Sequence, residues 1–320
     1  MAEEIIESDD FVRNAYIIIN EMLDLSNHTT EDTTVLVDEI LHSIFFLGTI
    51  TNSAYTPKKI LDVKFAEIKA LYPKPFECYS SQLPRRSPFS CVLDMIVRLT
   101  GQENEKGIQT TLQRLIDDLR KGAKSDQKCL FSSAICISQA GQSSVKHYGV
   151  SMSTSTRDAR EIMVAVSCCH EWDEYVAGAV MTYFPNKKKN KSKDRKTEID
   201  GTIRLPENVK CRAFSLLDGK VKPPCRSCAN LFSLKTSTIE KWPYGNCAES
   251  ESLSNLFKNE AQVKNRVELQ TPMSWTAEYK EGAKKTLLTF LKNSLKKVNF
   301  NQDMIVYTPT ISGEKVNVHI

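Results

Sequence analysis

Hydrophobic side chains recur at helical spacing through the first third of the chain. Apolar positions three and four residues apart mark one buried face of a helix, and polar residues fill the remaining positions. Ser90 can serve as a helix cap, and the prolines just before it predict a loop. The helices predicted from this pattern cover residues 16–23, 36–45, 61–71, 90–99 and 107–119.

The pattern changes after Gly122, where short apolar runs rich in β-branched residues replace the helical spacing. These runs predict strands over residues 130–137, 162–169, 175–184, 201–205 and 212–217. Two short helices, each starting at a cysteine, are expected next, followed by a basic helix over residues 277–297 and a strand over residues 304–308. We therefore expect an α+β (or α/β) protein. A helical N-terminal region, residues 1–124, would precede a domain with a mixed β-sheet, residues 125–320.

The composition is typical of a soluble globular protein, with 41% hydrophobic and 26% charged residues in a chain of 320. No apolar run approaches the ~20 residues that a membrane-spanning helix needs. The acidic start, M-A-E-E, resembles neither a secretory signal nor a basic presequence. We expect a cytoplasmic protein without a membrane partner, a nuclear location staying open. The oligomeric state is not predicted.

Charge is distributed unevenly, although the net charge is only +4. The first fifty residues carry eleven acidic side chains and one basic side chain, Arg13, whereas residues 185–242 carry fifteen lysines and arginines and six acids. The most basic run, Lys187 to Lys196, is expected to be a solvated hairpin tip. The alternative is that it contacts the phosphates of a nucleotide or a nucleic acid.

Two cysteine motifs lie close together in the C-terminal half. The first reads P-P-C-R-S-C and ends at Cys228, and the second reads N-C-A-E and starts at Asn246. The prolines favour an extended approach and then a helix from Cys225, which brings Cys225 and Cys228 to one side of its first turn. Asn246 is a good N-cap, so a second helix is expected to begin at Cys247.

Three thiolates and one carboxylate match the needs of a catalytic zinc site. Cys225, Cys228 and Cys247 are the predicted ligands of Zn²⁺, and they leave the fourth coordination position to water. Glu249 lies two residues after Cys247, about 200° around the helix, so its carboxylate is expected beside the metal as a general acid and base.

Other interpretations of these cysteines stay open. The thiols could be packed in the core without metal, or a fourth protein ligand could close the site and make the zinc purely structural. Cys247 could also be the nucleophile of a cysteine hydrolase, with His147 or His170 as its base. The candidates for a fourth ligand are Cys168, Cys169, His170 and Cys211.

Over residues 224–249 the chain resembles the cytidine-deaminase-like superfamily, whose signature combines P-C-x-x-C with H-x-E or C-x-E. The two elements stand here in reversed order. The resemblance implies a mixed β-sheet with both motif helices on one face, zinc bound by the three cysteines, and Glu249 as the proton shuttle. Aromatic and polar side chains before the second helix would line the base pocket, namely Trp242, Tyr244 and Asn246.

The longer pattern P-P-C-x-x-C…Y-G-N-C-A-E-x-E-x-L-S-N-L-F also looks like that of interferon-inducible, reovirus-induced antiviral proteins of fish. That second resemblance implies a role in innate immunity. The leading expectation is zinc-dependent hydrolytic deamination of a nucleoside, a nucleotide or a nucleic-acid base. The second is a non-catalytic antiviral interaction protein with a structural zinc site, and the third is the cysteine hydrolase that uses Cys247.

Overall fold

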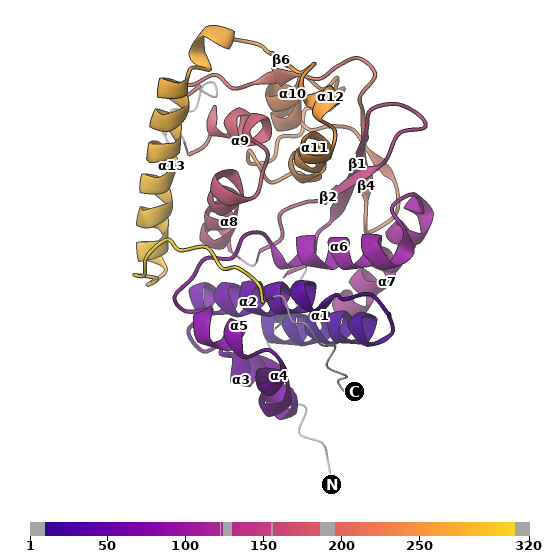
Figure 1. Ribbon diagram of the computed structural model, residues 1–320, viewed down its shortest axis with the longest axis vertical. Coiled ribbons are helices and arrows are strands. Elements are labelled where there is room, and N and C mark those ends of the chain that lie inside the picture. The colour runs from indigo at the N-terminus through magenta and orange to yellow at the C-terminus, as the bar shows by residue number, and fades with distance from the viewer. Residues whose placement is uncertain (1–9, 122, 124–129, 155, 186–195, 311–320) are drawn as a thin grey trace.

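The computed structural model describes the chain except residues 1–9, 122, 124–129, 155, 186–195 and 311–320. Helices form the lower half of the molecule in Figure 1, and a small sheet with its own helices forms the upper half. A long helix, α13, runs along one side of the upper half, and the chain then returns to the N-terminal helices. The predicted α+β class, with helices before the sheet, is confirmed.

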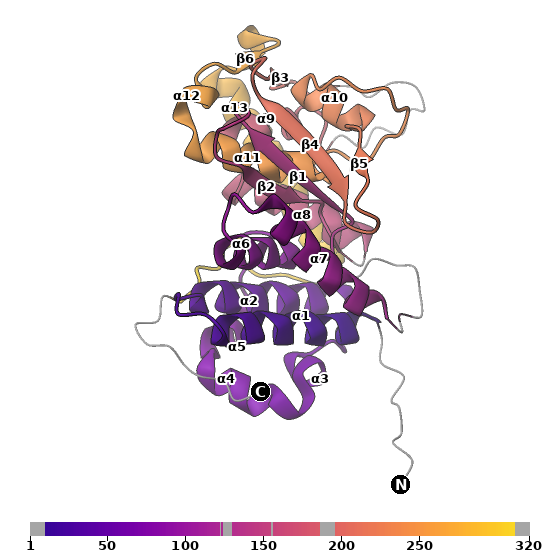
Figure 2. The same cartoon turned by 90° about the vertical axis from the view of Figure 1, so that its right-hand side faces the viewer.

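The N-terminal helices form where the hydrophobic spacing predicts them. In α1, the buried residues Phe11, Ala15, Ile18 and Met22 recur every three or four positions on one face. Figure 2 shows α1 and α2 side by side, with α6 and α7 between them and the sheet. The helices are α1 (Asp10–Asn27), α2 (Thr34–Thr51), α3 (Pro57–Leu61), α4 (Phe65–Leu71), α5 (Pro73–Cys78), α6 (Pro88–Thr100) and α7 (Glu105–Arg120).

Helix α2 is apolar almost all the way around. Among the helices that the structure describes, it alone is long and apolar enough to cross a membrane. However, 83% of its residues are buried inside the fold, where it packs against α1, α5 and α6. Burial on all sides accounts for its composition, as in the central helix of a protein core.

The sheet has four strands in the order β2-β1-β4-β5, and every pairing in it is antiparallel. The resemblance implied a mixed sheet; the difference arises because hairpins join β1 to β2 and β4 to β5. A separate antiparallel pair joins β3 to β6. The strands are β1 (Ala134–Gln139), β2 (His147–Val150), β3 (Ile203–Arg204), β4 (Lys210–Ser215), β5 (Val221–Lys222) and β6 (Glu268–Leu269).

Two segments predicted as strands are helices. Residues 162–169 lie in α8 (Arg157–His170), and residues 175–184 lie mostly in α9 (Glu174–Met181). The side chains of Thr156 and Asp173 cap these helices by accepting hydrogen bonds from N–H groups of the first turn. The prediction was wrong because a short apolar run has the same pattern in a buried strand and in a helix that is buried on most sides.

The end of the described chain behaves partly as predicted. The basic helix forms as α13 (Ala277–Lys297), with the predicted bounds. Residues 304–308 form no regular strand; a single parallel bridge joins Val306 to Leu83 in the loop before α6. The N–H of Leu83 donates to Ile305 O at 2.7 Å, and the N–H of Tyr307 donates to Leu83 O at 2.8 Å.

Helix α11 (Ala248–Asn259) lies directly on the sheet and is held there by polar side chains. Ser252 Oγ donates to His147 O at 3.0 Å, and Glu251 accepts the N–H of Val150 at 2.7 Å. Gly149 lets the helix approach, because a Cβ at that position would lie 2.2 Å from the backbone N of Ser252. The first turn of α11 is therefore fixed relative to the strands.

Buried apolar side chains from both halves form one continuous cluster, from Phe11 to Phe300. The predicted division at residues 124 and 125 coincides with the change from helices to sheet, and as a domain boundary it stays a prediction. The predicted basic hairpin tip falls outside the described residues, except for Lys196, which forms an ion pair with Asp200.

Candidate metal centre and its pocket

Two helices present their N-terminal cysteines to one another. Cys225 precedes α10 (Arg226–Phe232), and Cys247 precedes α11, each in an extended conformation at the N-cap position. Asn246 was predicted to be the second cap; the helix begins one residue later because the chain turns at Gly245, whose φ is +80°. The starts of these two consecutive helices bring three thiols together.

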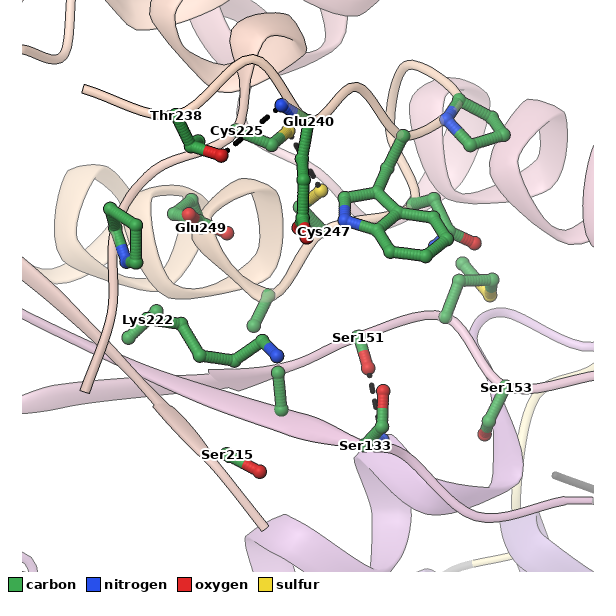
Figure 3. Close-up of a pocket in the computed structure, with 18 of the residues that line it drawn as sticks. Ser133, Ser151, Ser153, Ser215, Lys222, Cys225, Thr238, Glu240, Cys247 and Glu249 are labelled. Carbon is green, nitrogen blue, oxygen red and sulfur yellow. Dashed lines mark hydrogen bonds between the residues drawn. The ribbon is translucent and has the colours of Figure 1, made fainter. Parts of the chain in front are cut away.

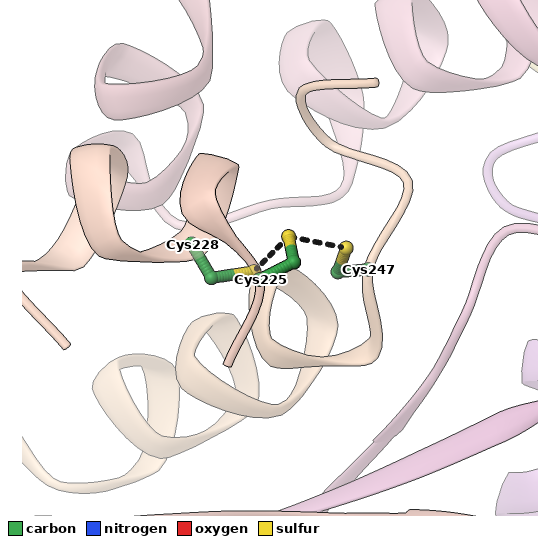
Figure 4. A group of neighbouring side chains, drawn as sticks. All are labelled: Cys225, Cys228 and Cys247. Carbon is green, nitrogen blue, oxygen red and sulfur yellow. Dashed lines mark hydrogen bonds between the residues drawn. The ribbon is translucent and has the colours of Figure 1, made fainter. Parts of the chain in front are cut away.

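The sulfur atoms of Cys225, Cys228 and Cys247 all lie within 4.8 Å of one another (Figure 4). The Sγ of Cys225 is 3.7 Å from that of Cys228 and 3.5 Å from that of Cys247. Thiolates at ~2.3 Å from a tetrahedral zinc ion are about 3.8 Å apart. The spacing and the soft donor set therefore fit a metal ion such as zinc.

Hydrogen bonds among the three thiols shift their pKa values in opposite directions. Hydrogen bonding with Cys228 and Cys247 lowers the pKa of Cys225 far below that of an ordinary thiol. The same hydrogen bonding to Cys225 raises the pKa of Cys228, and burial adds to that shift. A cation bound among the sulfurs would remove the remaining protons, since metal binding and thiol deprotonation are coupled.

Glu249 lies on the first turn of α11, next to the thiols (Figure 3). The residue is only 5% exposed, and burial raises the pKa of its carboxyl to about 7, although a hydrogen bond with Cys228 opposes part of the shift. A carboxyl that titrates near neutral pH can both accept and donate a proton under physiological conditions.

Cys225, Cys247 and Glu249 line a pocket of about 720 Å³. The sheet contributes one side, and the loop before α11 contributes another, including Trp242, which is 51% exposed, and Asn246. Tyr244 is not among the lining residues. Its ring stacks on Tyr183 with centroids 4.3 Å apart, and its hydroxyl accepts a hydrogen bond from Asn230. Two of the three residues expected in the pocket, Trp242 and Asn246, thus line it.

Two buried polar atoms that face this pocket have no hydrogen-bond partner in the described part of the chain. They are Ser153 Oγ and Asn246 Oδ1. Buried polar atoms are normally paired, so such an orphan indicates a group that the fold leaves to a ligand or a water molecule. Sequence reasoning missed Ser153, because the loop after β2 carries no motif and reaches the pocket only through the tertiary fold.

The candidates for a fourth ligand do not join the cluster within the described residues. Cys211 lies on β4, with its sulfur 3.3 Å from that of Cys136 on the neighbouring strand. Cys168, Cys169 and His170 end helix α8, where a strand had been predicted. Cys247 forms hydrogen bonds with Cys225 and Cys228, and neither His147 nor His170 lines the pocket.

No family model matches this chain, and no curated protein or solved structure matches it either. Among the described residues, the structure supports a group of three cysteines, Cys225, Cys228 and Cys247, that could hold a metal ion.

Proposed function

We propose that the protein is a zinc-dependent hydrolytic deaminase acting on an amino-substituted base of a nucleoside, a nucleotide or a nucleic acid. The observation that carries this proposal is the buried carboxyl of Glu249 beside three clustered thiols at the end of an open pocket. These are the groups that the deaminase signature supplies, although the two motifs occur here in reversed order.

In this proposal Cys225, Cys228 and Cys247 would hold a zinc ion, whose chemistry would be to lower the pKa of a water molecule toward neutral pH. The carboxyl of Glu249, buried on the first turn of α11 beside these thiols, would take a proton from this water and return it to the substrate. Trp242 and Asn246 line the same pocket and would contact the base by stacking and by hydrogen bonding.

The reaction is redox-neutral, and its atoms balance. A C–O bond forms between water and the ring carbon that bears the amino group, and the exocyclic C–N bond breaks to release ammonia. Glu249 carries one proton from the water to the adjacent ring nitrogen and a second proton to the departing amine. The products are the keto base and ammonia.

A non-catalytic interaction protein with a closed, structural zinc site is the second candidate. It would need a fourth protein ligand, and within the described residues the metal-ligating group contains three members only. The cysteine hydrolase would need a histidine at Cys247, and none of the described residues that line the pocket is a histidine. Both features favour the deaminase.

The test compares Glu249→Gln with Glu240→Gln, because both carboxylates line the pocket but only Glu249 is buried. Zinc-loaded protein is assayed for ammonia release from cytosine- and adenine-containing nucleosides, nucleotides and single strands. We expect Glu249→Gln to lower the rate by about 10²–10⁴-fold with zinc retained, and Glu240→Gln to change it much less. Undiminished turnover by Glu249→Gln, or no ammonia from any substrate with zinc-loaded wild type, would refute the proposal.

A further inference from the structure

The pocket beside the cysteines contains two cations without a partner. Lys222 from β5 and Arg160 from α8 both line it, and neither forms an ion pair with any residue that the structure describes. Lys220, a third lining cation, differs because it pairs with Asp218 at 3.0 Å. Unpaired cations converging on one cavity from separate elements are a common arrangement for binding an anion.

Hydroxyl groups lie on the same side of the pocket as Lys222. Figure 3 shows Ser133, Ser151 and Ser153 at the sheet side with Lys222, whereas Glu240 and Glu249 lie nearer the sulfurs. Ser153 is only 4% exposed, and its Oγ has no partner within the described chain. An O–H group buried without an acceptor is an independent sign that a ligand supplies one.

The charges thus divide the pocket into two ends. Two carboxylates, of Glu240 and Glu249, lie at the cysteine end, and they would repel an anionic group placed there. Lys222 and the hydroxyl of Ser153 lie on the sheet side, away from the sulfurs (Figure 3), and Arg160 lines the same pocket; an anion bound there would gain charge-assisted hydrogen bonds. The volume of about 720 Å³ is in the range of small-molecule sites and leaves room for more than a base.

We propose that the ligand of this pocket is a nucleotide, with its phosphate bound by Lys222, Arg160 and the hydroxyl of Ser153 while its base faces the cysteines. This inference rests on the proposed function for the identity of the base. The phosphate itself is assigned by the residues at the opposite end. The same phosphate could belong to a free monophosphate or to a single strand, and the test separates these sources.

Binding is measured by calorimetry on the zinc-loaded Glu249→Gln protein, so that turnover does not interfere. The probes are cytidine, adenosine, their 5′-monophosphates and a single-stranded oligodeoxycytidine of about twelve nucleotides. We expect a monophosphate to bind at least about tenfold more tightly than its nucleoside, as charge-assisted hydrogen bonds predict. Lys222→Gln and Arg160→Gln should each remove most of this difference and leave nucleoside binding unchanged.

Lys210→Gln is the matched control, because Lys210 lies on β4, is exposed and does not line the pocket. It removes the same charge and should not change the affinity for the monophosphate. Melting temperatures verify that all variants fold. Tighter binding of the oligonucleotide than of either monophosphate, lost in Lys222→Gln, would assign the phosphate to a single strand.

Equal affinity for nucleoside and monophosphate, or equal weakening of both by Lys222→Gln, would overturn the phosphate site and leave the deaminase proposal intact. The converse result is also distinguishable. Monophosphate binding that depends on Lys222, together with no ammonia release by the zinc-loaded wild type, would support the phosphate site and refute the deaminase. No binding of any probe would overturn the phosphate site.

Discussion

The two halves of the molecule bury carboxylates in opposite ways. In the N-terminal half, Glu39 is held by Arg86 through hydrogen bonds of 2.9 and 3.0 Å, and Arg86 also pairs with Asp94. In the C-terminal half, Glu249 is buried and forms no ion pair with any residue that the structure describes, and the same pocket also contains the hydroxyl of Ser153, which has no partner among those residues. The charges of the first site are paired with one another, whereas Glu249 and the hydroxyl of Ser153 in the second site are available to contact a ligand.

The pKa shifts of the two glutamates follow from this difference. Burial alone would raise the pKa of Glu39, but the positive charge of Arg86 outweighs it, and the pKa is lowered. Burial dominates at Glu249 and raises its pKa to about 7. Burial therefore raises the pKa of a carboxyl where no nearby cation compensates it, and it does not by itself identify a functional group.

The largest expected effect is the loss of metal from the cysteine group. Cys225→Ser should lower the zinc content from about one ion per chain to almost none, because structural and catalytic zinc sites depend on each thiolate. The melting temperature should fall with it, since zinc binds only the folded arrangement. Elemental analysis and thermal unfolding of the variant measure both changes.

Cys136→Ala is the control, because Cys136 belongs to the other close pair of sulfurs, with Cys211. It should retain zinc, with only the stability loss expected from a small cavity, about 1 kcal/mol. Full zinc content and an unchanged melting temperature in Cys225→Ser would show that the ligand assignment is wrong.

Glu39→Gln tests the buried carboxylate that forms an ion pair with Arg86. Removing the carboxylate leaves the guanidinium of Arg86 with Asp94 alone in a buried setting, and we expect a loss of about 3 kcal/mol in the free energy of unfolding. Glu249→Gln, which breaks no ion pair, should cost less than about 1 kcal/mol. Urea unfolding measures the free energy of unfolding of both variants. Comparable losses would show that the ion pair of Glu39 does not distinguish its site from that of Glu249.

A pH experiment sharpens the comparison with a third buried carboxyl, Glu251, which anchors α11 to β2. Burial raises the pKa of Glu251 from 4.5 to about 7. Between these values the folded protein binds a proton that the unfolded chain has released, so its contribution to stability is lost as the pH rises through this window. The sign is the reverse for Glu39, whose lowered pKa makes it stabilising above its unfolded value and less so as the pH falls.

The expected change from Glu251 is of the order of 2 kcal/mol between pH 5 and pH 7.5. Glu251→Gln keeps the shape of the side chain and removes the titration, so its stability should change less than that of the wild type over this range. Urea unfolding at the two pH values gives the comparison. Parallel behaviour of variant and wild type would mean that Glu251 titrates as in the unfolded chain.

The elements predicted well from the sequence are those whose signals are local. Helix α13 has the predicted bounds, and the two cysteine motifs start helices because prolines and turn residues precede them. The thiol cluster itself was predictable, since it needs only that two helix starts face each other. Helices α8 and α9 were missed because their apolar runs lack a polar face that would reveal the helical period.

The group of pocket residues proposed to bind phosphate could not be predicted in the same way. Arg160, Ser153 and Lys222 come from a helix, a loop and an edge strand, and none has a neighbour in sequence that signals a shared site. Their convergence depends on the antiparallel sheet and on the position of α8, whose residues 162–169 are predicted from the sequence to form a strand. Residues that only the tertiary fold brings together show no characteristic spacing in the sequence, so a motif search does not find them.

The smallest expected effect concerns Trp242. Its substitution distinguishes a contact of the ring with the base from a role of the ring in stabilising the fold. Its ring is half exposed at the pocket, so Trp242→Ala should leave the melting temperature nearly unchanged. If the base stacks on this ring, the affinity for nucleoside should fall by about 1–3 kcal/mol. Tyr244→Phe is the matched aromatic change outside the pocket: it keeps the stack on Tyr183 and removes only the hydroxyl that Asn230 contacts. It should therefore leave nucleoside affinity unchanged, and a loss as large as that of Trp242→Ala would mean that the loop before α11 acts through its conformation and not through stacking.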